Sequence, residues 1–540
     1  MTWSTGKELS LESWLGCWQI HTTDLEHSMY HINLTEYFDD LVKRSPNRTA
    51  VIEGDSSITA AVLRQRCLAI GKTISDHLQG NIRQIIAVYL PKSIDSIAVD
   101  IAIIYSGNAY MNLDLKQPAQ RTINIFALIQ PALIITRRAL AEQLEHLPGC
   151  PPLLLLEDMA RHGSLTLEDE QALLTKRDRI IDTDPLCIIN TSGSTGTPKG
   201  VVLNHKSFID FTESATAAGL LREEEVAASL SPLIFDIYSF ELCMLMAKGC
   251  TLLLLPETLA AFPARMLELM VTHRVSFIFW VPTIMVNIAN LNLLDQIPLP
   301  DLQMIWFAGE VFPTAKCNYW RGKLPWATFV NLYGPIEITL DCLYHVLQRE
   351  LADDDPIPIG KPFRNTDIII LNDEDESVRQ GEEGELCIRG TSLALGYYNN
   401  PDKTALVFTQ NPLNKAYPEY IYRTGDMVCA NEYGELVFKG RKDTLIKHLG
   451  YRIELAEIEH VLVNKLKIVK NCCAVYNSEE KRIILFYESE MQLEIKRLRA
   501  SIGGILPKYM IPAVYIWLSA MPLNANGKID RLKLKGMLKD

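Results

Sequence analysis

The sequence predicts an α/β protein with a later antiparallel section and a small α+β domain at the end of the chain. Apolar runs alternate with helical stretches between residues 85 and 136, and strand patterns of period two follow at 384–390 and 434–440. A compact set of helices and strands follows Asp443. Because 540 residues exceed a domain of ordinary size, we expect more than one core.

The first packed element is expected at residues 31–44. Its apolar residues fall on one helical stripe, and Asn33 and Glu36 have the spacing of a capping box. The preceding residues, 1–32, form an extension rich in Trp and His to which the pattern assigns no role. The large domain is therefore placed from residue 33 onward.

The middle of the chain changes from α/β to antiparallel character. The runs IIAVYL at 85–90 and ALIIT at 132–136 predict strands, with a helix at 93–107 between them. Further on, GELCIRG (384–390) and GELVFKG (434–440) predict strands, and the turn-like NEYG precedes the second. An antiparallel section is the simplest arrangement of these later strands.

The last part of the chain predicts a separate α+β domain. An amphipathic helix, LAEIEHVLVNKL, precedes the strand patterns CCAVY and RIILFYES, which flank NSEEK. Another helix and the strand AVYIWL complete the set. We expect domains at 33–443 and 444–540, with the boundary at Asp443.

Composition excludes several classes of protein. The net charge of −12 argues against a nucleic-acid partner, which needs a broad cationic surface. The longest apolar windows fall far below the roughly 20 residues of a membrane span, so no membrane insertion is expected. The 12 Cys form no CxxC pair and the first residues lack a secretory pattern, which predicts free thiols and a cytoplasmic protein.

The segment NTSGSTGTPKG at 190–200 has the composition of a phosphate-binding loop. Glycines let backbone amides approach an anion, and hydroxyl groups donate to it. Such a run alone is more often a connector, but the strand-like PLCII before it and Lys199 behind it favour a nucleotide site. It is not a Walker loop, because Gly200 follows Lys199. The expected phosphate ligands are Thr191, Ser192, Gly193, Ser194, Thr195, Gly196 and Lys199.

A series of further motifs follows this loop in a fixed order. Together they resemble the adenylate-forming enzymes, and within them the adenylation domains of nonribosomal peptide synthetases, over residues 33–540. The motifs are TSGSTGTPKG (191–200), FDIYSFE (235–241), NLYGPIE (331–337), GELCIRG (384–390), YRTGD (422–426), GRKDTLIKHLGYRIEL (440–455), LPKYMIP (506–512) and NANGKIDR (524–531).

The resemblance implies a layered α/β N-terminal domain with a distorted β-barrel section and a mobile C-terminal domain. It also implies a ligase that joins a carboxylate to the α-phosphate of ATP, releases pyrophosphate and passes the acyl group to a thiol. Lys528 would reach between the carboxylate and the phosphate, where developing charge needs a fixed cation. Glu337 would hold Mg²⁺ against phosphate oxygens. The implied cofactors are ATP and Mg²⁺.

The resemblance assigns an ATP site as well. Asp426 would accept hydrogen bonds from both ribose hydroxyls, with Arg441 on the same side, and Tyr333 would stack on adenine. Ile336 stands where Thr is usual, so one phosphate donor worth about 1 kcal/mol is absent or supplied elsewhere. The other residues assigned to this site are Asn331, which would read the adenine amine, Gly309 and Gly334.

Two residues are implied in the domain movement of the family. Asp443 would be the hinge about which the small domain reorients between the two half-reactions. That movement would take Lys528 out of the site and bring the segment around Gly450 in, so that Gly450 lines the path of the thiol.

Asp236 indicates an α-amino acid substrate. A carboxylate beside an apolar strand needs a cationic partner, and an α-ammonium supplies one. Phe240, Phe279 and Trp306 would fill most of the pocket, which favours a substrate with a small side chain, glycine first, then alanine or serine. Asp341 could instead hold a polar or basic substrate side chain. The pocket residues implied by the resemblance are Asp236, Ile237, Phe240, Phe279, Trp306, Ala308, Leu332, Leu340 and Asp341, closed by Lys528.

The thiol is expected on another molecule, because the sequence ends nine residues after Arg531. The phosphopantetheine arm of a separate carrier protein is the first expectation, and coenzyme A is the second. Enzymes of this kind take part in the synthesis of peptide natural products or in modification of the cell envelope, such as lipid A modification. One alternative is an acyl- or aryl-CoA ligase, which Asp236 disfavours. A luciferase-like oxygenase shares the fold and is a second alternative. The third is a catalytically silent nucleotide-binding or regulatory protein, in which Lys528, Glu337 or Asp426 would be expected to be replaced.

Overall fold

The computed structural model describes residues 31–159, 165–192, 198–442, 445–523 and 529–538. Several sequence predictions lie outside these ranges, so the structure does not bear on them: the extension 1–30, Gly193, Ser194, Thr195, Gly196, Asp443 and Lys528.

The first sheet has nine strands in the order β15-β14-β13-β12-β11-β9-β10-β1-β2. Its central strands, from β1 through β13, pair in parallel, and both edges are antiparallel. The strands are β1 (Thr49–Glu53), β2 (Ser56–Thr59), β9 (Val226–Ser229), β10 (Thr251–Leu254), β11 (Phe277–Trp280), β12 (Met304–Phe307), β13 (Thr328–Tyr333), β14 (Leu343–Val346) and β15 (Lys361–Pro362).

The second sheet has seven strands in the order β18-β8-β7-β4-β3-β5-β6. It contains both strands predicted between residues 85 and 136, with the predicted helix as α4 (Ile94–Tyr105) between them. The strands are β3 (Ile85–Tyr89), β4 (Ala109–Asn112), β5 (Leu133–Thr136), β6 (Leu153–Leu155), β7 (Pro185–Thr191), β8 (Lys199–Asn204) and β18 (Gly396–Tyr397).

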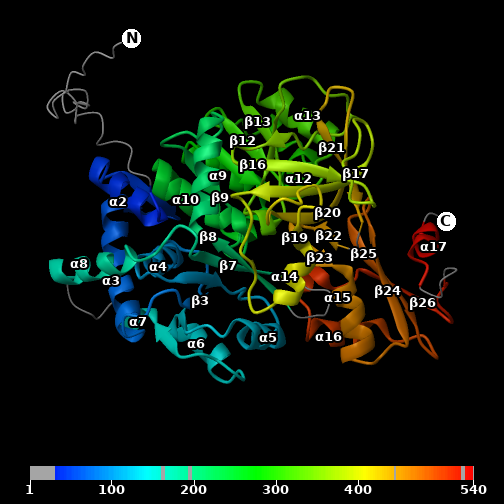
Figure 1. The fold of residues 1–540 in the computed structure, drawn as a ribbon, viewed down its shortest axis with the longest axis horizontal. Helices are drawn as coiled ribbons and strands as arrows, with labels where there is room; N and C mark the ends of the chain where they lie inside the picture. The colour runs from blue at the N-terminus through cyan, green and yellow to red at the C-terminus, as the bar shows by residue number, and fades with distance from the viewer. Residues whose placement is uncertain (1–30, 160–164, 193–197, 443–444, 524–528, 539–540) are drawn as a thin grey trace, which may run out of the picture.

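Helices cover these two sheets (Figure 1). The first, α2 (Leu34–Arg44), begins with the predicted capping box, in which Asn33 and Glu36 satisfy each other's backbone amides. The others are α3 (Ala60–His77), α5 (Ala119–Ile129), α6 (Arg138–Glu145), α7 (Leu156–Met159), α8 (Leu167–Arg177), α9 (His205–Ala217), α10 (Asp236–Lys248), α11 (Pro263–Thr272), α12 (Pro282–Asn290), α13 (Thr314–Lys323) and α14 (Pro401–Val407), with 3₁₀ turns at Glu257–Ala261, Leu293–Asp295 and Ile336–Ile338.

The predicted antiparallel section is a five-stranded sheet. Its strands run in the order β16-β17-β20-β19, and β21 pairs with β20 on the same sheet. Both GEL motifs fall on its strands, as the alternation of apolar and polar residues predicts. The strands are β16 (Thr366–Leu371), β17 (Gly384–Gly390), β19 (Phe408–Gln410), β20 (Tyr420–Ala430) and β21 (Leu436–Arg441).

The end of the chain forms a smaller set with its own apolar core, whose buried members lie between Ile453 and Leu534. In Figure 1 its orange and red elements lie to the right, with a two-stranded hairpin between them and the N-terminal sheets. The elements are β22 (Leu445–His448), β23 (Tyr451–Glu454), α15 (Leu455–His460), a π turn (Val461–Lys465), β24 (Asn471–Asn477), β25 (Arg482–Glu488), α16 (Ile495–Gly503), a 3₁₀ turn (Lys508–Met510), β26 (Val514–Leu518) and α17 (Arg531–Gly536).

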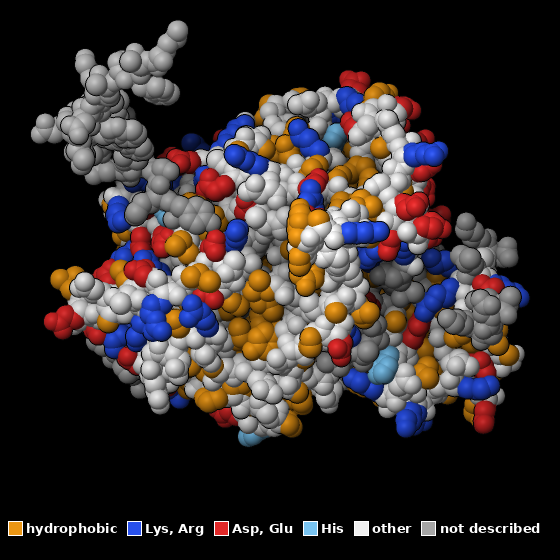
Figure 2. All heavy atoms as spheres, viewed as in Figure 1, with side chains coloured by type: hydrophobic (Ala, Val, Ile, Leu, Met, Phe, Trp, Pro, Cys, Tyr) orange, Lys and Arg blue, Asp and Glu red, His pale blue; other side chains and the backbone are white. Residues whose placement is uncertain are grey.

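Charges of both signs are distributed over the surface. On the face shown in Figure 2, Lys and Arg side chains lie among Asp and Glu side chains, and apolar side chains gather near the centre. The cysteines in the described part of the chain are all free thiols, as predicted, and most of them are buried. No helix in the described ranges has the length and apolar character that crossing a membrane requires.

Candidate active site

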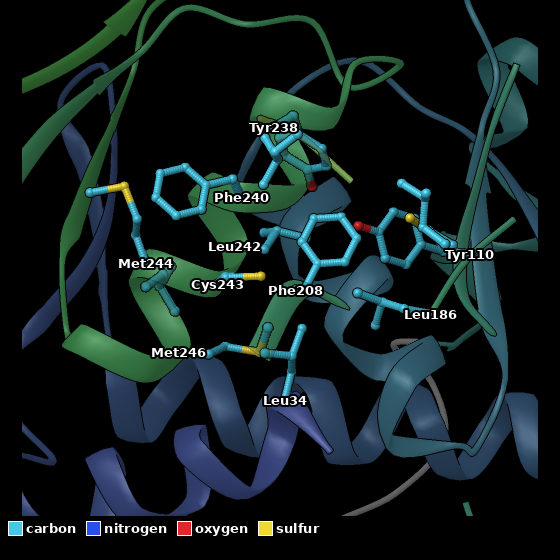
Figure 3. Packing of buried hydrophobic residues seen from close by; sticks show 14 of the residues in the cluster. Leu34, Tyr110, Leu186, Phe208, Tyr238, Phe240, Leu242, Cys243, Met244 and Met246 are labelled. Carbon is cyan, nitrogen blue, oxygen red and sulfur yellow. The ribbon is translucent and has the colours of Figure 1, made fainter. Parts of the chain in front are cut away.

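Helix α10 carries Asp236 as its first residue, and buried polar pairs hold this helix in place. The Tyr238 hydroxyl donates to Asp100 at 2.7 Å, and the Tyr110 hydroxyl donates to Ser239 at 2.8 Å. Figure 3 shows Tyr238 of α10 and Tyr110 of β4 in one packed cluster with Phe240 and Leu242. The helix start, and with it Asp236, is therefore held at the edge of a close-packed core.

Asp236 faces a cavity of about 280 Å³. The cavity is lined by the ends of β11 and β12, the start of α10, the segment after β13, and the hairpin β22–β23. Six of the nine residues predicted for the substrate pocket line it: Asp236, Ile237, Phe279, Ala308, Leu340 and Asp341.

The other three predicted pocket residues, Phe240, Trp306 and Leu332, belong to the core next to the cavity instead of its wall. Trp306 lies on β12, two residues before Ala308, which follows the strand and reaches the cavity. The Trp306 ring stacks on Phe240 with centroids 5.4 Å apart and meets Phe279 edge-on at 5.5 Å. These rings close off the space below the cavity.

The residues that line the cavity include three carboxylates and two cations: Asp236, Asp341, Glu257, Lys447 and Arg452. Burial raises the pKa of Asp236 to about 6. Burial and the neighbouring Asp236 carboxylate raise the pKa of Asp341 well above its usual value. Burial lowers the pKa of Lys447, against the opposing effect of Asp426 and Asp341. Buried acidic groups in a small cavity require positive charge or hydrogen-bond donors, part of which Lys447 and Arg452 supply.

The raised pKa of Asp236 predicts a pH dependence. Only the ionised carboxylate can pair with a substrate ammonium, so kcat/KM for the amino acid is expected to fall about tenfold per pH unit below about pH 6. The Asp236 and Asp341 carboxylates repel each other, so the pH at which the rate falls reports on both groups. Initial rates of pyrophosphate release between pH 5 and pH 8 would measure it, and a profile flat down to pH 5 would contradict it.

The backbone next to Asp341 adopts a conformation that few side chains favour. Thr339 and Leu340 both have positive φ, at 54° and 63°. A side chain at Gly334 would place its Cβ 2.5 Å from the Asp341 Cα, so only glycine fits beside this segment. The close approach of these two segments sets the position of Asp341 in the cavity.

The residues predicted for the ribose lie together. Asp426 on β20 and Arg441 on β21 are direct neighbours across the sheet and form an ion pair. The Tyr333 hydroxyl donates to the same carboxylate. Asn331 donates its amide to the Pro358 carbonyl at 2.7 Å, and Gly309, with φ of 91°, lines the cavity. Tyr333 therefore has a hydrogen-bonding role in addition to any stacking on adenine.

Glu337 is fully buried and accepts a hydrogen bond from Tyr397 at 2.7 Å. It also forms an ion pair with Arg452 of β23. Burial alone would raise its pKa, but the Arg452 guanidinium lowers the pKa of Glu337 to about 2. Glu337 is therefore an ionised carboxylate at a position that favours a cation. Such a group suits Mg²⁺, which is often held by one or two carboxylates together with substrate phosphates.

The hairpin β22–β23 inserts against the predicted phosphate loop. Ser192 and Lys199 both contact β23, through Arg452 and Glu454. At the hairpin turn, Gly450 donates its N–H to Glu310 at 2.8 Å and lines the cavity, where the thiol path was predicted.

Four residues in these contacts were not assigned by sequence reasoning: Glu310, Lys447, Arg452 and Glu454. Three of them lie within the motif GRKDTLIKHLGYRIEL, but Arg452 and Glu454 pair with residues more than 100 positions away in the sequence. The feature of the sequence that could have indicated Arg452 and Glu454 is their spacing of two residues, which places both on one face of a strand.

The family of the chain follows from its similarity to known proteins. The profile of the family described as "AMP-binding enzyme" matches residues 38–398. This match covers more than half of the chain, so the chain belongs to the AMP-binding enzyme family, a class of adenylate-forming enzymes. At family level it is an AMP-forming ligase, and Gramicidin S synthase 1 of Brevibacillus brevis is among the proteins to which it is similar.

Two relatives illustrate the extent of similarity. Delta-poly-L-ornithine synthetase of Acinetobacter baumannii (strain AB307-0294) is 30% identical over 510 residues, which are 93% of this chain and 36% of that protein. Zwittermicin A synthase ZmaJ of Bacillus cereus is 28% identical over 508 residues, 92% of this chain and 94% of that protein. The chain thus spans about a third of the first relative and nearly all of the second.

Solved structures share the fold. The adenylation domain AlmE of Vibrio cholerae, solved in complex with glycyl-adenosine-5'-phosphate, has a TM-score of 0.79 at 20% identity and covers 95% of this chain and 99% of that one. Holo-PA1221, which contains adenylation and PCP domains, has a TM-score of 0.78 at 23% identity, covering 94% of this chain and 84% of that one. The α/β architecture with a smaller C-terminal set is therefore that of adenylation domains.

Proposed function

We propose that the enzyme activates a small α-amino acid and transfers it to the phosphopantetheine thiol of a separate carrier protein. A carboxylate oxygen of the amino acid attacks the α-phosphorus of ATP, and the bond to pyrophosphate breaks. The thiol sulfur then attacks the acyl carbon, AMP leaves with the electrons of the broken C–O bond, and the thiol proton passes to solvent.

The observation that carries this proposal is the position of Asp236. Its carboxylate lies at the cavity, on the helix start held by the core, and the cavity is also lined by Gly309 and Gly334 of the predicted ATP site. A substrate seated there has its α-ammonium beside Asp236 and its carboxylate toward Glu337 and the phosphate loop. Acyl- and aryl-CoA ligases would have no cation for Asp236, which disfavours that alternative.

The aromatic floor supports a small side chain. The rings of Trp306, Phe240 and Phe279 pack against each other and form this floor. Each methylene added to the substrate side chain must therefore find room above a close-packed surface. Glycine, alanine and serine are the candidates. Within this set, Asp341 favours a side chain that donates a hydrogen bond, which only serine does.

A basic amino acid is the second candidate. Asp341 would then pair with a side-chain ammonium while Asp236 holds the α-ammonium, and the name of one relative refers to ornithine. If glycine is the substrate, the enzyme would be a glycine:carrier-protein ligase that acts in modification of the cell envelope, such as lipid A modification. With serine or alanine, peptide natural product synthesis is favoured.

The experiment is amino-acid-dependent ATP–pyrophosphate exchange across all common amino acids and ornithine. The wild-type enzyme is expected to prefer glycine, alanine or serine, with larger apolar residues inactive and differences of about 10 to 200-fold per methylene. Trp306→Ala should shift the preference toward larger side chains. Asp341→Asn should reduce serine activation more than alanine activation, whereas the exposed control Asp354→Asn should change neither.

Preference for ornithine or lysine would replace the small-substrate proposal by the second candidate. Exchange without any amino acid preference would contradict both. Transfer to a carrier protein is measured separately, with radiolabelled amino acid and a phosphopantetheinylated carrier against free coenzyme A.

A further inference from the structure

We propose that strand β23 is an internal substitute for Mg·pyrophosphate, in which Arg452 and Glu454 are positioning residues that occupy Glu337 and Lys199 only when this product has left. The inference rests on the proposed function, because it assigns Glu337 to the metal and Lys199 to phosphate. It adds a physical link between the first half-reaction and the second.

Arg452 takes the place of a metal ion on Glu337. The Glu337 side chain has no exposed surface, and its two carboxylate oxygens are engaged by Tyr397 and Arg452. The guanidinium itself is only 14% exposed. A buried carboxylate without a cation is costly, so something positive must stay at this position whenever the metal is absent. In this arrangement Arg452 is that cation.

Glu454 takes the place of a phosphate on the predicted phosphate loop. Its carboxylate pairs with Lys199, and its backbone N–H donates to the Ser192 hydroxyl at 3.1 Å. The same hydroxyl donates to the Arg452 carbonyl oxygen at 2.8 Å. Two residues expected to bind phosphate are thus both used by β23.

The order of charges on the strand matches that of the product. Arg452 and Glu454 are two residues apart and therefore lie on one face of β23, with the positive group at Glu337 and the negative group at Lys199. Mg·pyrophosphate bound by the same residues would present its cation and its anion in that order. Both cannot occupy Glu337 and Lys199 at once, so docking of β23 and retention of the product exclude each other.

The docked strand also completes the site for the second step. It continues directly into α15, where Glu457 forms a buried ion pair with Arg121 at 2.9 Å. The turn before it holds Gly450 against Glu310 at the cavity. These contacts lie on one hairpin and the helix that follows it. They can therefore form together once the product has left. The enzyme would thus open the thiol path only after adenylation has become irreversible through product release.

The test measures binding of pyrophosphate with excess Mg²⁺ by isothermal titration calorimetry, using the whole chain without ATP, amino acid or carrier protein. The variants are Arg452→Met and Glu454→Gln, with Arg497→Met and Glu490→Gln as exposed controls from the same end of the chain. If β23 is docked in about 90% of molecules, removing the internal competitor tightens the apparent Kd about tenfold. The controls should bind as the wild type does. Unchanged or weaker binding in both β23 variants would overturn the proposal.

Amide hydrogen exchange supplies a second readout that does not depend on affinity. In the wild-type protein, Mg·pyrophosphate should speed exchange in residues 445–466, and in Arg452→Met this segment should exchange rapidly without it. Exchange that ignores the product would also overturn the proposal. Since neither measurement contains an amino acid, failure here and failure of the substrate panel are separate results. Circular dichroism shows whether each variant is folded.

Discussion

Replacing Lys528 with alanine is expected to lower amino-acid-dependent ATP–pyrophosphate exchange by at least about 10². Lys528 lies outside the described residues, and its assignment rests on the NANGKIDR motif. The attack of a carboxylate on a phosphate brings two anions together, and one preorganised charged donor typically contributes a factor of about 10² to 10³. The rate is measured with saturating ATP and the best amino acid.

Lys535→Ala is the matched control for this prediction, because Lys535 is an exposed lysine on α17 nearby in the sequence. It should exchange at the wild-type rate. Thermal unfolding of Lys535→Ala should match the wild type, since an exposed lysine contributes little to stability. The same measurement shows whether Lys528→Ala is folded. Exchange in Lys528→Ala within tenfold of the wild type would show that another cation stabilises the transferred phosphate.

Local patterns account for most of the fold. The strands at 85–90 and 132–136 are buried runs between helical stretches, and the antiparallel sheet follows from the alternation in both GEL motifs. Pairing order could not be predicted in the same way. Strand β1 pairs with β10, some 200 residues further along the chain, and no local pattern encodes such a partner.

The same limit explains which site residues were found. Asp236, Glu337 and Asp426 belong to short motifs whose chemistry can be assigned one residue at a time. Arg452 and Glu454 gain their roles only from partners at Glu337 and Lys199, in contacts that the folded chain creates. A charged pair two residues apart on a short strand is common on exposed faces, so sequence alone does not distinguish this one.

Pocket depth was the other property that sequence could not provide. Trp306 of β12 and Ala308, which follows the strand, are two residues apart, and only the folded structure shows which of them reaches the cavity. We therefore expect Trp306 to affect substrate size by supporting the floor of the cavity. Its replacement by alanine should therefore enlarge the cavity without removing a direct contact to the substrate.

Asp236→Asn is expected to lower kcat/KM for the preferred amino acid by at least about 10², through loss of the partner of the α-ammonium. Breaking a buried ion pair by removing one side costs about 3–5 kcal/mol, because the remaining charge stays desolvated. Asparagine keeps the oxygen that accepts the Ile237 N–H at 3.0 Å, so the start of α10 should be undisturbed. KM for ATP should change little, since Asp236 faces the amino acid.

An α-hydroxy acid with the same side chain separates this charge effect from general damage to the site. It carries no ammonium, so wild type and Asp236→Asn should activate it with kcat/KM values within about threefold, which makes the loss specific to the amino acid. Pyrophosphate release is measured for both substrates with both proteins. If the variant lost the hydroxy acid and the amino acid equally, Asp236 would be supporting the cavity rather than pairing with the ammonium, and the class of substrate would have to be assigned again.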